Sequence, residues 1–523
     1  MNQPAAVVLE ENVPFSQSKL WQAQREFYDK KGIDAWTSDV PFYITSNPFI
    51  ANHYAQIVIR FIQDWCRKYP DAKKHPFYIV ELGTGSGQFS FYVMKKIFEL
   101  RAQLNLEAVT IQYIMSDFTK KNLEFWKQHV ALQSFSKKKW LDFSVFDLEN
   151  DTCITLINSK IVLQSGTVHN PLIAVANYIF DTLITDIFTV QKNKLHESLV
   201  KLKTLKRNVK QNKPVHWEKV KINFKSNEIL ETYYHNELDN ILFEYQKTLE
   251  DSHFPFPIGS LRCIQHLNHI SQNKLLLLSS DKGYTTISEL DNLDYPYIDF
   301  HGSFSVMVNF HTIGQYFKMH GGDYCHEICH DSITSTVFVS GMKWDDFPET
   351  KLALQQVITG FSASDYFSFY EHFEKIAQRE KLNVLVSFLC LSQWDPFIFD
   401  IMVSRLIELL PNSEESTVAF LVKNIPQVAD HFYFLPDCED IFFSIGLLLY
   451  ELDLFSEALN YYKKSEKYFG VGFESLMNSG LCYLYLNRYK SALKYFTKAH
   501  KLKPRSKQIK TLIDEMRQKV STL

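Results

Sequence analysis

The sequence predicts an α/β domain with a Rossmann-like sheet and an inserted β-ribbon, followed by an all-α repeat domain. From Phe77 to about residue 190, short apolar runs alternate with helical stretches, which is typical of a parallel sheet. Beyond about Trp344 the strand signals end and helical periodicity takes over. The chain has 523 residues, whereas a single core rarely grows beyond roughly 250 to 300, so we expect two or three domains.

The composition is that of a globular protein and limits its partners. Apolar residues make up 46% of the chain and aromatic residues 15%, enough to close the expected cores. The formal net charge is −3, so no overall positive field attracts nucleic acid, and we expect no nucleic-acid partner. The apolar runs are too short for a bilayer, and the segment MNQPAAVVLEENVPF lacks the basic residues of a targeting signal. We expect a cytoplasmic protein without membrane contact, whose eight cysteines are reduced thiols.

The α/β domain is predicted to span residues 1–343. Residues 1–75 are expected to be helices around the aromatic loop PFYITSNPF and to form a lid. Buried strands are expected at FYIVEL, VTIQYIMSD, LDFSVFDL, LIAVANYIF and LLLLSSDKG. The Lys-rich, partly alternating segment 190–260 interrupts this order and predicts the inserted β-ribbon, while a helix is expected from about Thr312 to His320.

Residues 344–523 are predicted to be helical and to end in two repeats, 439–472 and 473–506. Three pairs of residues lie 34 positions apart, the tetratricopeptide period: Gly446 and Gly480, Ala458 and Ala492, and Tyr462 and Phe496. Small residues let paired helices approach, and large ones fill the space between them. Because about three such units are needed for a continuous core, residues 345–436 are expected to supply degenerate helical pairs. Stacked pairs present a concave surface suited to a protein substrate or peptide partner.

The segment VELGTGSGQFS, residues 80–90, predicts a ligand loop. A buried strand runs into Gly83, Thr84, Gly85 and Gly87 and then directly into a helix, so the backbone can approach a ligand beneath a helix N-terminus. A nucleotide-like ligand is implied. Because a glycine pattern of this kind is not specific, a dinucleotide is the alternative.

Three acids favour S-adenosylmethionine as the cofactor over a dinucleotide. Glu81 precedes the glycines, where methyltransferases use an acid to orient the loop and the amino-acid end of the donor. Asp117 ends the second strand, where its carboxylate can accept both ribose hydroxyls, and Asp147 ends the third strand near the expected adenine edge. All three lie at the carboxyl edge of the predicted sheet. The alternative for Asp117 and Asp147 is that they cap helices.

Several segments in order resemble the MidA-type S-adenosylmethionine-dependent methyltransferases, which are related to the mitochondrial complex I assembly factor that methylates a protein arginine. The segments are FYITSNPFIANHYA, VELGTGSGQFS, VANYIFDTLITDIF, SSDKG and GSFSVMVNF, and together they span roughly residues 40 to 320. The resemblance implies a methyltransferase that acts on a protein side chain, with arginine favoured.

The third of these segments carries the expected acceptor residues. An arginine acceptor must be held by carboxylates and must lose a proton as it is methylated. We expect Asn177 and Asp181 to bind the acceptor, with Tyr178 at the lip of the site; the alternative for Asp181 is a helix cap. This chain has Tyr178 where the family has Glu, Ile184 where it has Pro, and Ser303 where it has Asp. These departures raise the alternative of a different acceptor or an inactive domain.

Two further functions stay open at this point. One is a non-catalytic scaffold that keeps the fold while its repeats bind a protein; the other is a small-molecule methyltransferase whose repeats serve oligomerisation. Donor binding separates the scaffold from the enzymes, and the size of the acceptor separates the two enzymes.

Two residue clusters admit a functional and an ordinary interpretation. Zinc is conceivable at DYCHEICHD, where Cys325 and Cys329, and His326 and His330, are each four apart, but structural zinc sites usually pair two knuckles, so we expect no metal. The basic residues of the insert can meet an acidic protein surface or can simply be solvated: Lys201, Lys203, Lys206, Arg207, Lys210 and Lys213.

Overall fold

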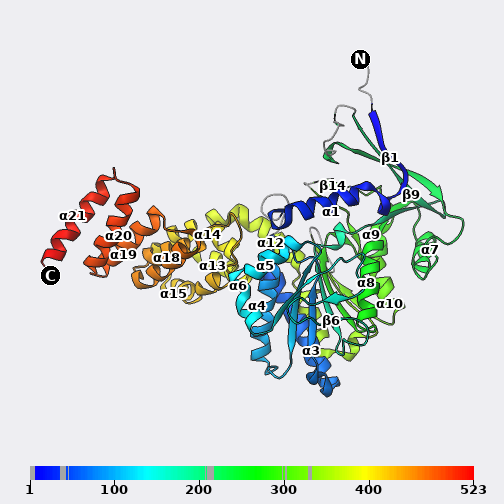
Figure 1. Ribbon diagram of the computed structural model, residues 1–523, viewed down its shortest axis with the longest axis horizontal. Helices are drawn as coiled ribbons and strands as arrows, with labels where there is room; N and C mark the ends of the chain where they lie inside the picture. Colours follow the sequence, from blue (N-terminus) through cyan, green and yellow to red (C-terminus); the bar gives the residue numbers. More distant parts are fainter. Residues whose placement is uncertain are drawn as a thin grey trace, which may run out of the picture. The chain divides into compact units, whose positions relative to one another are not determined.

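The computed structural model describes residues 6–35, 43–44, 46–205, 208, 217–296, 298–300, 303–327 and 333–522. The chain divides into two compact units, Met1–Ser368 and Phe369–Leu523. Figure 1 shows a mixed α/β arrangement in the first and helices throughout the second. The predicted fold class is therefore confirmed. The domain limits expected from the sequence, 1–343 and 344–523, stay a prediction.

A seven-stranded sheet forms the centre of the first unit. Its strands, in spatial order, are β17 (Asp323–His326), β18 (Thr334–Val339), β12 (Leu275–Asp281), β7 (Leu172–Asn177), β2 (Phe77–Glu81), β3 (Ile111–Asp117) and β4 (Leu141–Val145). The five strands from β12 to β4 are parallel, and β18 and β17 are antiparallel. Chain order reverses between β2 and β7. In open α/β sheets, a crevice for ligands opens at the carboxyl ends of the strands at such a point.

Helices cover the strands of this sheet, which are buried almost throughout. Every residue of β2 and β12 is buried, as expected for parallel strands with both faces covered. The main helices are α3 (Pro48–Lys68), α4 (Gln88–Gln103), α5 (Lys120–Gln128), α6 (Val130–Lys137), α8 (Ile258–Ile270) and α10 (Phe310–Met319). Short elements are β5 (Ile154–Thr155), β6 (Val162–Leu163), β13 (Gly283–Tyr284), β14 (Asp299–Phe300), β15 (Phe304–Ser305), β16 (Val308–Asn309) and α9 (Ile287–Leu290).

The first unit continues beyond the predicted limit at Lys343. Helix α11 (Pro348–Val357) packs against α3. The buried carboxylate of Asp64 on α3 accepts hydrogen bonds from the Thr350 backbone N–H at 2.8 Å and from its hydroxyl at 2.9 Å. Sequence periodicity shows that α11 is a helix but does not show which core it covers.

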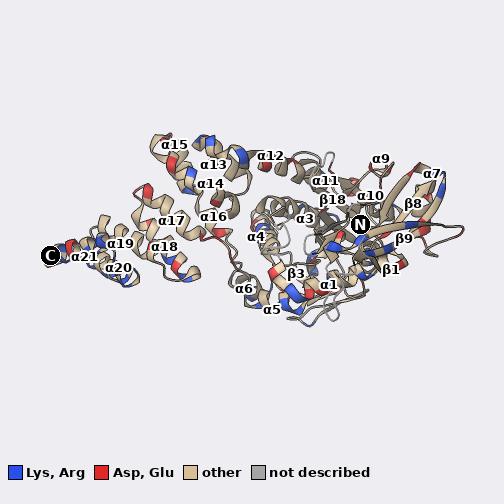
Figure 2. Cartoon of the chain, turned by 90° about the horizontal axis from the view of Figure 1, so that it is seen from above, with Lys and Arg blue, Asp and Glu red and all other residues tan. Residues whose placement is uncertain are grey.

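The second unit is built of helical pairs. They follow α12 (Ala363–Ile376), which crosses the division: α13 (Leu382–Leu391), α14 (Pro396–Leu409), α15 (Glu415–Asn424), α16 (Pro426–Asp430), α17 (Ile441–Glu451), α18 (Phe455–Phe469), α19 (Phe473–Tyr485), α20 (Tyr489–Leu502) and α21 (Lys507–Ser521). Each repeat glycine faces an aromatic ring: a Cβ on Gly446 would lie 2.6 Å from Tyr462, and one on Gly480 2.5 Å from Phe496. Lys and Arg residues follow one another along α20 and α21, blue in Figure 2.

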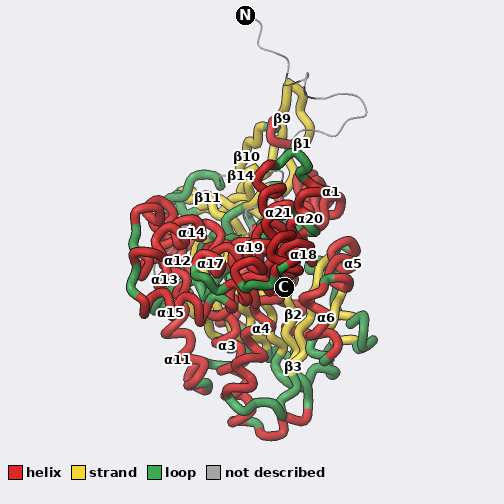
Figure 3. The backbone as a smooth tube through the Cα atoms, turned by 90° about the vertical axis from the view of Figure 1, so that its left-hand side faces the viewer, coloured by secondary structure: helices red, strands yellow, loops and turns green. Residues whose placement is uncertain are grey.

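A second, antiparallel sheet corrects the expectation that the N-terminal 75 residues are helical. Strand β1 (Ala6–Pro14) pairs with β9 (Lys194–Leu205), which also pairs with β10 (Lys221–Glu228) and β8 (Asp186–Gln191), and β8 pairs with β11 (Ser252–Phe256). Figure 3 shows β1, β9 and β10 side by side. The strand β1 has little alternation, and its partner is about 190 residues away in the chain, so local sequence gives no sign of it. The insert contains the expected ribbon and, in addition, α7 (Leu238–Thr248) and β11.

Helix α1 (Lys19–Lys31) follows β1 and is fixed by its buried face. The Trp21 ring packs against Phe304 with centroids 4.8 Å apart, and its indole N–H donates to the Phe15 carbonyl at 2.8 Å. The Gln24 amide donates to the Phe304 carbonyl. These contacts hold α1 over the ends of the central strands, where the cavities lie.

Candidate functional site

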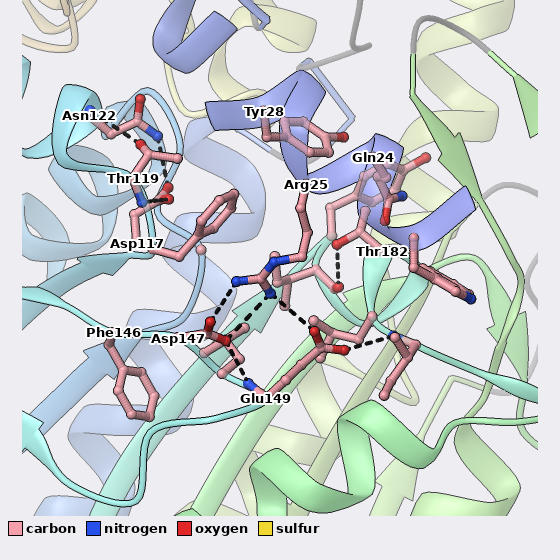
Figure 4. Close-up of a pocket in the computed structure, with 18 of the residues that line it drawn as sticks. Gln24, Arg25, Tyr28, Asp117, Thr119, Asn122, Phe146, Asp147, Glu149 and Thr182 are labelled. Atoms are coloured by element: carbon pink, nitrogen blue, oxygen red, sulfur yellow. Dashed lines mark hydrogen bonds and ion pairs between the residues drawn. The ribbon is translucent and has the colours of Figure 1, made fainter. Parts of the chain in front are cut away.

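Two adjoining cavities open at the carboxyl ends of β2, β3, β4 and β7. The larger, about 840 Å³ including the open space at its mouth, is walled by α1 and by the loops after the four strands. The smaller, about 290 Å³, is lined by Ser46, Glu81, Gly83, Thr84, Ser86, Phe89 and Asn177. Gly83 lines both cavities. Figure 4 shows side chains of the larger cavity converging from α1 and from the strand ends.

The glycine loop lies between the two cavities. Gly83, Gly85 and Gly87 have φ angles of 64°, 59° and 84°, in the left-handed region that favours glycine. A Cβ on Gly83 would lie 2.5 Å from the Ile179 side chain. Thr84 ties the loop to β3, because its N–H donates to the Ser116 carbonyl at 2.9 Å and its hydroxyl accepts from the Ser116 N–H at 3.1 Å. The predicted cradle is therefore present, and α4 begins directly after it.

Glu81 lies at the end of β2, where its carboxyl lines the smaller cavity. The side chain accepts hydrogen bonds from the Ser90 hydroxyl and, at 2.8 Å, from the Tyr113 hydroxyl. Burial raises the pKa of Glu81 to about 7 in spite of these donors. A cationic group in the smaller cavity would favour the ionised form.

Asp117 ends β3 and lines the larger cavity. Its carboxylate accepts from the Thr119 N–H at 3.0 Å, the Asn122 amide at 2.8 Å and the Gly85 N–H at 3.3 Å. Burial raises its pKa despite these bonds. The side chain that caps α5 is Thr119, which accepts from the Asn122 N–H. Asp117 is thus fixed between the glycine loop and α5, with its carboxylate at the cavity wall.

Asp147 follows β4 and also lines the larger cavity. Its carboxylate is paired with Arg25 of α1 at 2.5 Å and accepts from the Asn150 amide at 3.0 Å and from the Glu149 N–H at 3.1 Å. Burial would raise the pKa of Asp147, but hydrogen bonds from Asn150 and Arg25 outweigh it and hold the pKa below its usual value. No helix starts here; the residue stabilises the turn after the strand.

Asn177 and Tyr178 stand at the junction of β7 with the loop that follows. Asn177 lines the smaller cavity, and its amide oxygen accepts from the Tyr54 hydroxyl at 3.3 Å. Tyr178 lines the larger cavity with a φ of 55°, and its N–H donates to the Ser280 carbonyl at 2.8 Å. The strand end therefore directs the two neighbours into different cavities.

Asp181 lies behind the cavity wall. Its side chain is 3% exposed and lines neither cavity, whereas the next residue, Thr182, lines the larger one. The Asp181 N–H donates to the carboxylate of Asp281, at the end of β12, at 3.1 Å. Burial raises the pKa of Asp181 to about 7; burial and the charge of Asp181 raise that of Asp281 well above its usual value. Strand β8 follows rather than an α-helix, so Asp181 caps no helix of the α type.

Sequence reasoning missed the residues that α1 brings to the larger cavity. Trp21, Gln24, Arg25 and Tyr28 line it at helical spacing, and the Arg25 guanidinium carbon lies 4.9 Å from the centre of the Phe118 ring. The regular spacing of these residues on one face of α1 is visible in the sequence. The local sequence does not show which strand ends this face covers. Glu149 and Asp281 were missed for the same reason, since their partners are distant in the chain.

Parts of the two ambiguous clusters lie outside the described residues, namely Cys329, His330, Lys206, Arg207, Lys210 and Lys213. Residues Asp323–His326 form strand β17. Within the described part of the chain, no group of three or more His, Cys, Asp or Glu side chains is arranged to hold a metal ion. Lys201 pairs with Glu11 of β1.

Residues 57–289 match the family described as "Putative S-adenosyl-L-methionine-dependent methyltransferase". This segment is similar to the S-adenosylmethionine-dependent methyltransferases of that family. The match includes the glycine loop, both strand-end acids and the loop after β7, and it confirms the predicted enzyme class and cofactor. Residues 473–506 match the tetratricopeptide repeat family, which confirms the type of repeat.

Two solved structures from Burkholderia thailandensis resemble this chain at 12% identity. One is an uncharacterized protein, with a TM-score of 0.36 over 60% of this chain and 73% of that one. The other, of the same superfamily and bound to S-adenosyl-homocysteine, has a TM-score of 0.39 over 60% of this chain and 74% of that one. No curated protein matches the chain. Among the helices of the described segments, none is long and apolar enough to cross a membrane.

Proposed function

We propose that the protein transfers the methyl group of S-adenosylmethionine to a protein side chain, with arginine favoured. The observation that carries the donor placement is the pair of cavities that meet at Gly83, with Glu81 in one and Asp117 in the other. The donor supplies a methyl group on a positively charged sulfur, open to in-line displacement. Glu81 and the glycine loop would hold its amino-acid end, and Asp117 its ribose. The protein then contributes chiefly by positioning the reactants and excluding water.

Two buried acids, Asp181 and Asp281, support arginine as the methyl acceptor. Asp181 and Asp281 interact closely and both have raised pKa values, so the pair can take up a proton near neutral pH. A guanidinium must lose a proton as it is methylated. Asn177 and Tyr178, which precede Asp181 in the chain, line the two cavities. The resemblance to the MidA-type enzymes supports the same acceptor.

The repeat unit supports a macromolecular acceptor or partner with an acidic surface. Residues 475–513 contain nine basic and no acidic residues, although the whole chain has a net charge of −3. All nine are exposed: Arg488, Lys490, Lys494, Lys498, Lys501, Lys503, Arg505, Lys507 and Lys510. Lysines 490, 494 and 498 follow one face of α20 at a spacing of one turn. Such a face attracts an acidic protein segment, and that attraction should weaken with salt.

The test is incubation with isotope-labelled S-adenosylmethionine and a host lysate, followed by mass spectrometry. We expect label on a protein, at arginine. Asp181→Asn should lower turnover, because it removes one acid of the buried pair, and should leave donor affinity nearly unchanged, because Asp181 lines neither cavity. Asp186→Asn is the matched control, because that buried carboxylate accepts from the Ser16 N–H and the Tyr234 hydroxyl and lines neither cavity.

Three outcomes would contradict the proposal. Label confined to small molecules favours the small-molecule enzyme. No label with wild type, but label after Tyr178→Glu, favours the scaffold, since that change restores the acid of the resembled family. Equal turnover by wild type and Asp181→Asn places the acceptor on other residues.

A further inference from the structure

The larger cavity is lined by an ion pair between α1 and the turn after β4. The Arg25 guanidinium donates to Asp147 at 2.5 Å and to Glu149 at 3.1 Å, and it lies over the Phe118 ring. Figure 4 shows it reaching from α1 toward both carboxylates. The side chains of Asp147 and Glu149 are only 23% and 12% exposed, whereas that of Arg25 is 39% exposed.

The carboxylate of Asp147 has no acceptor capacity left in this arrangement. One oxygen accepts from the Glu149 N–H at 3.1 Å and from Arg25 at 3.5 Å; the other accepts from Arg25 at 2.5 Å and from the Asn150 amide at 3.0 Å. A carboxylate has about four lone-pair sites. A new hydrogen bond to Asp147 therefore requires one of these donors to leave, and Arg25 is the only one on a separate element.

A donor whose ribose lies on Asp117 brings its base to this place. The base is bonded directly to the ribose, and the residue after Asp117 is Phe118, whose ring lines the same cavity. The space next to Phe118 and the acceptor sites of Asp147 are those that Arg25 occupies. The Arg25 guanidinium and the donor's base therefore compete for the same space and the same acceptor sites.

We propose that Arg25 is a positioning residue that exchanges with the donor's base: the base takes the Phe118 ring and Asp147, while Arg25 stays paired with Glu149. The inference rests on the donor placement proposed above but not on the identity of the acceptor. It makes the ion pair a competitor of the donor. Removal of the guanidinium should therefore strengthen donor binding, whereas removal of a group that contacts the base should weaken it.

Glu149 connects Arg25 to the loop after β7, where the acceptor is expected to bind. One of its oxygens holds Arg25, and the other accepts from the Ile184 backbone N–H at 3.0 Å. Ile184 ends the loop 178–184, which begins with Tyr178 and contains Asp181. A proline at position 184 would have no N–H to donate. Movement of Arg25 is thus transmitted through Glu149 to the segment expected to receive the acceptor.

The first measurement is calorimetric titration of the full-length protein with S-adenosylhomocysteine. Arg25→Ala should bind about two- to fivefold more tightly than wild type, the range expected from loss of a partly exposed ion pair. Gln22→Ala is the control, since it changes the exposed face of the same helix. Weaker or unchanged binding by Arg25→Ala would overturn the exchange. No binding by wild type would instead overturn the donor placement, and the exchange with it.

The second measurement is hydrogen exchange of loop 178–184 with and without S-adenosylhomocysteine. In wild type and in Ile184→Ala, which keeps the N–H, ligand binding should change the rate of hydrogen exchange in this loop. Ile184→Pro and Arg25→Ala should bind the ligand without that change. The preceding residue, Leu183, has φ −91° and ψ 154°, a conformation that permits a following proline. Thermal unfolding should first establish that Ile184→Pro is folded. The same ligand-induced change in all four proteins would contradict the link through Glu149.

Discussion

Glu81 is a buried acid in a cavity proposed to receive an ammonium group. Burial raises its pKa to about 7, so below that pH the side chain is mostly neutral. An ammonium prefers the carboxylate, and its binding must therefore drive a proton off Glu81. The number of protons released when the ligand binds should therefore report the ionisation of Glu81.

We predict that affinity for S-adenosylhomocysteine rises as pH increases through about 7 and levels off above it. The sign follows because the free protein carries a proton that the complex lacks. Calorimetry in two buffers of different ionisation enthalpy should show proton release into the buffer near pH 7. Glu81→Gln should bind more weakly and without this dependence. A wild-type affinity that is flat or falls over the interval would exclude the proposed role.

The donor-binding residues that the sequence predicts follow from local sequence patterns, whereas the site residues that it did not predict depend on contacts distant in the chain. Glu81 precedes the glycine loop directly, and Asp117 ends the next strand, so parallel pairing alone brings them to one edge. Arg25 meets Asp147 across 122 positions and Asp181 meets Asp281 across 100. No periodicity encodes such contacts, because they depend on where α1 and the later strands come to lie.

At the scale of elements, the repeat pairs are held by aromatic rings placed over glycines. A Cβ on Gly480 of α19 would lie 2.5 Å from the Phe496 ring of α20, so that the ring or the helices would have to shift. The 34-residue period anticipated this contact, because Gly480 and Phe496 both occupy repeat positions. The pairing is thus visible in the sequence as a matched small and large residue.

We predict that Gly480→Ala destabilises the second unit by about 1 to 3 kcal/mol, the usual cost of overpacking, although alanine favours helix more than glycine does. Gly472→Ala is the matched control: its Cβ would meet only Ser475, at 3.9 Å, and its φ of −94° suits alanine. Denaturant unfolding of the full-length variants measures both. Equal stability of Gly480→Ala and wild type would mean that the helices are not packed this closely.

Other elements differ in how far local sequence determines them. The helix expected at 312–320 is found at Phe310–Met319, because its apolar spacing is regular. Strand β1 was expected to be helical, since its stability comes from pairing with β9 and not from its own pattern. The ribbon of the insert was recognisable, whereas the helix and strand that complete it were not.

For the whole molecule, the question is where the methyltransferase unit ends. Periodicity marks the change to helices near Trp344, but contacts divide the chain after Ser368. The difference is α11, which covers α3 and hydrogen-bonds the buried Asp64 through Thr350. A truncation at the change of pattern would leave that carboxylate without these two donors.

We predict that a protein ending at Ser368 folds and binds S-adenosylhomocysteine with nearly full affinity. One ending at Lys343 should be less stable, because it exposes the apolar face of α3 and leaves Asp64 short of two hydrogen bonds. Thermal unfolding and calorimetry of the two proteins, side by side with the full chain, measure this. Equal stability of both truncated proteins would show that α11 contributes nothing to the first unit.

The most direct test of the proposed donor site is titration of the purified protein with S-adenosylhomocysteine and with NAD. We predict saturable binding of S-adenosylhomocysteine, no binding of NAD, and a loss of about 1 to 3 kcal/mol in Asp117→Ala, where a hydrogen-bonded carboxylate is removed. Thermal unfolding should first establish that the variant is folded. Binding of NAD, or an affinity for S-adenosylhomocysteine that Asp117→Ala leaves unchanged, would contradict the donor site described above.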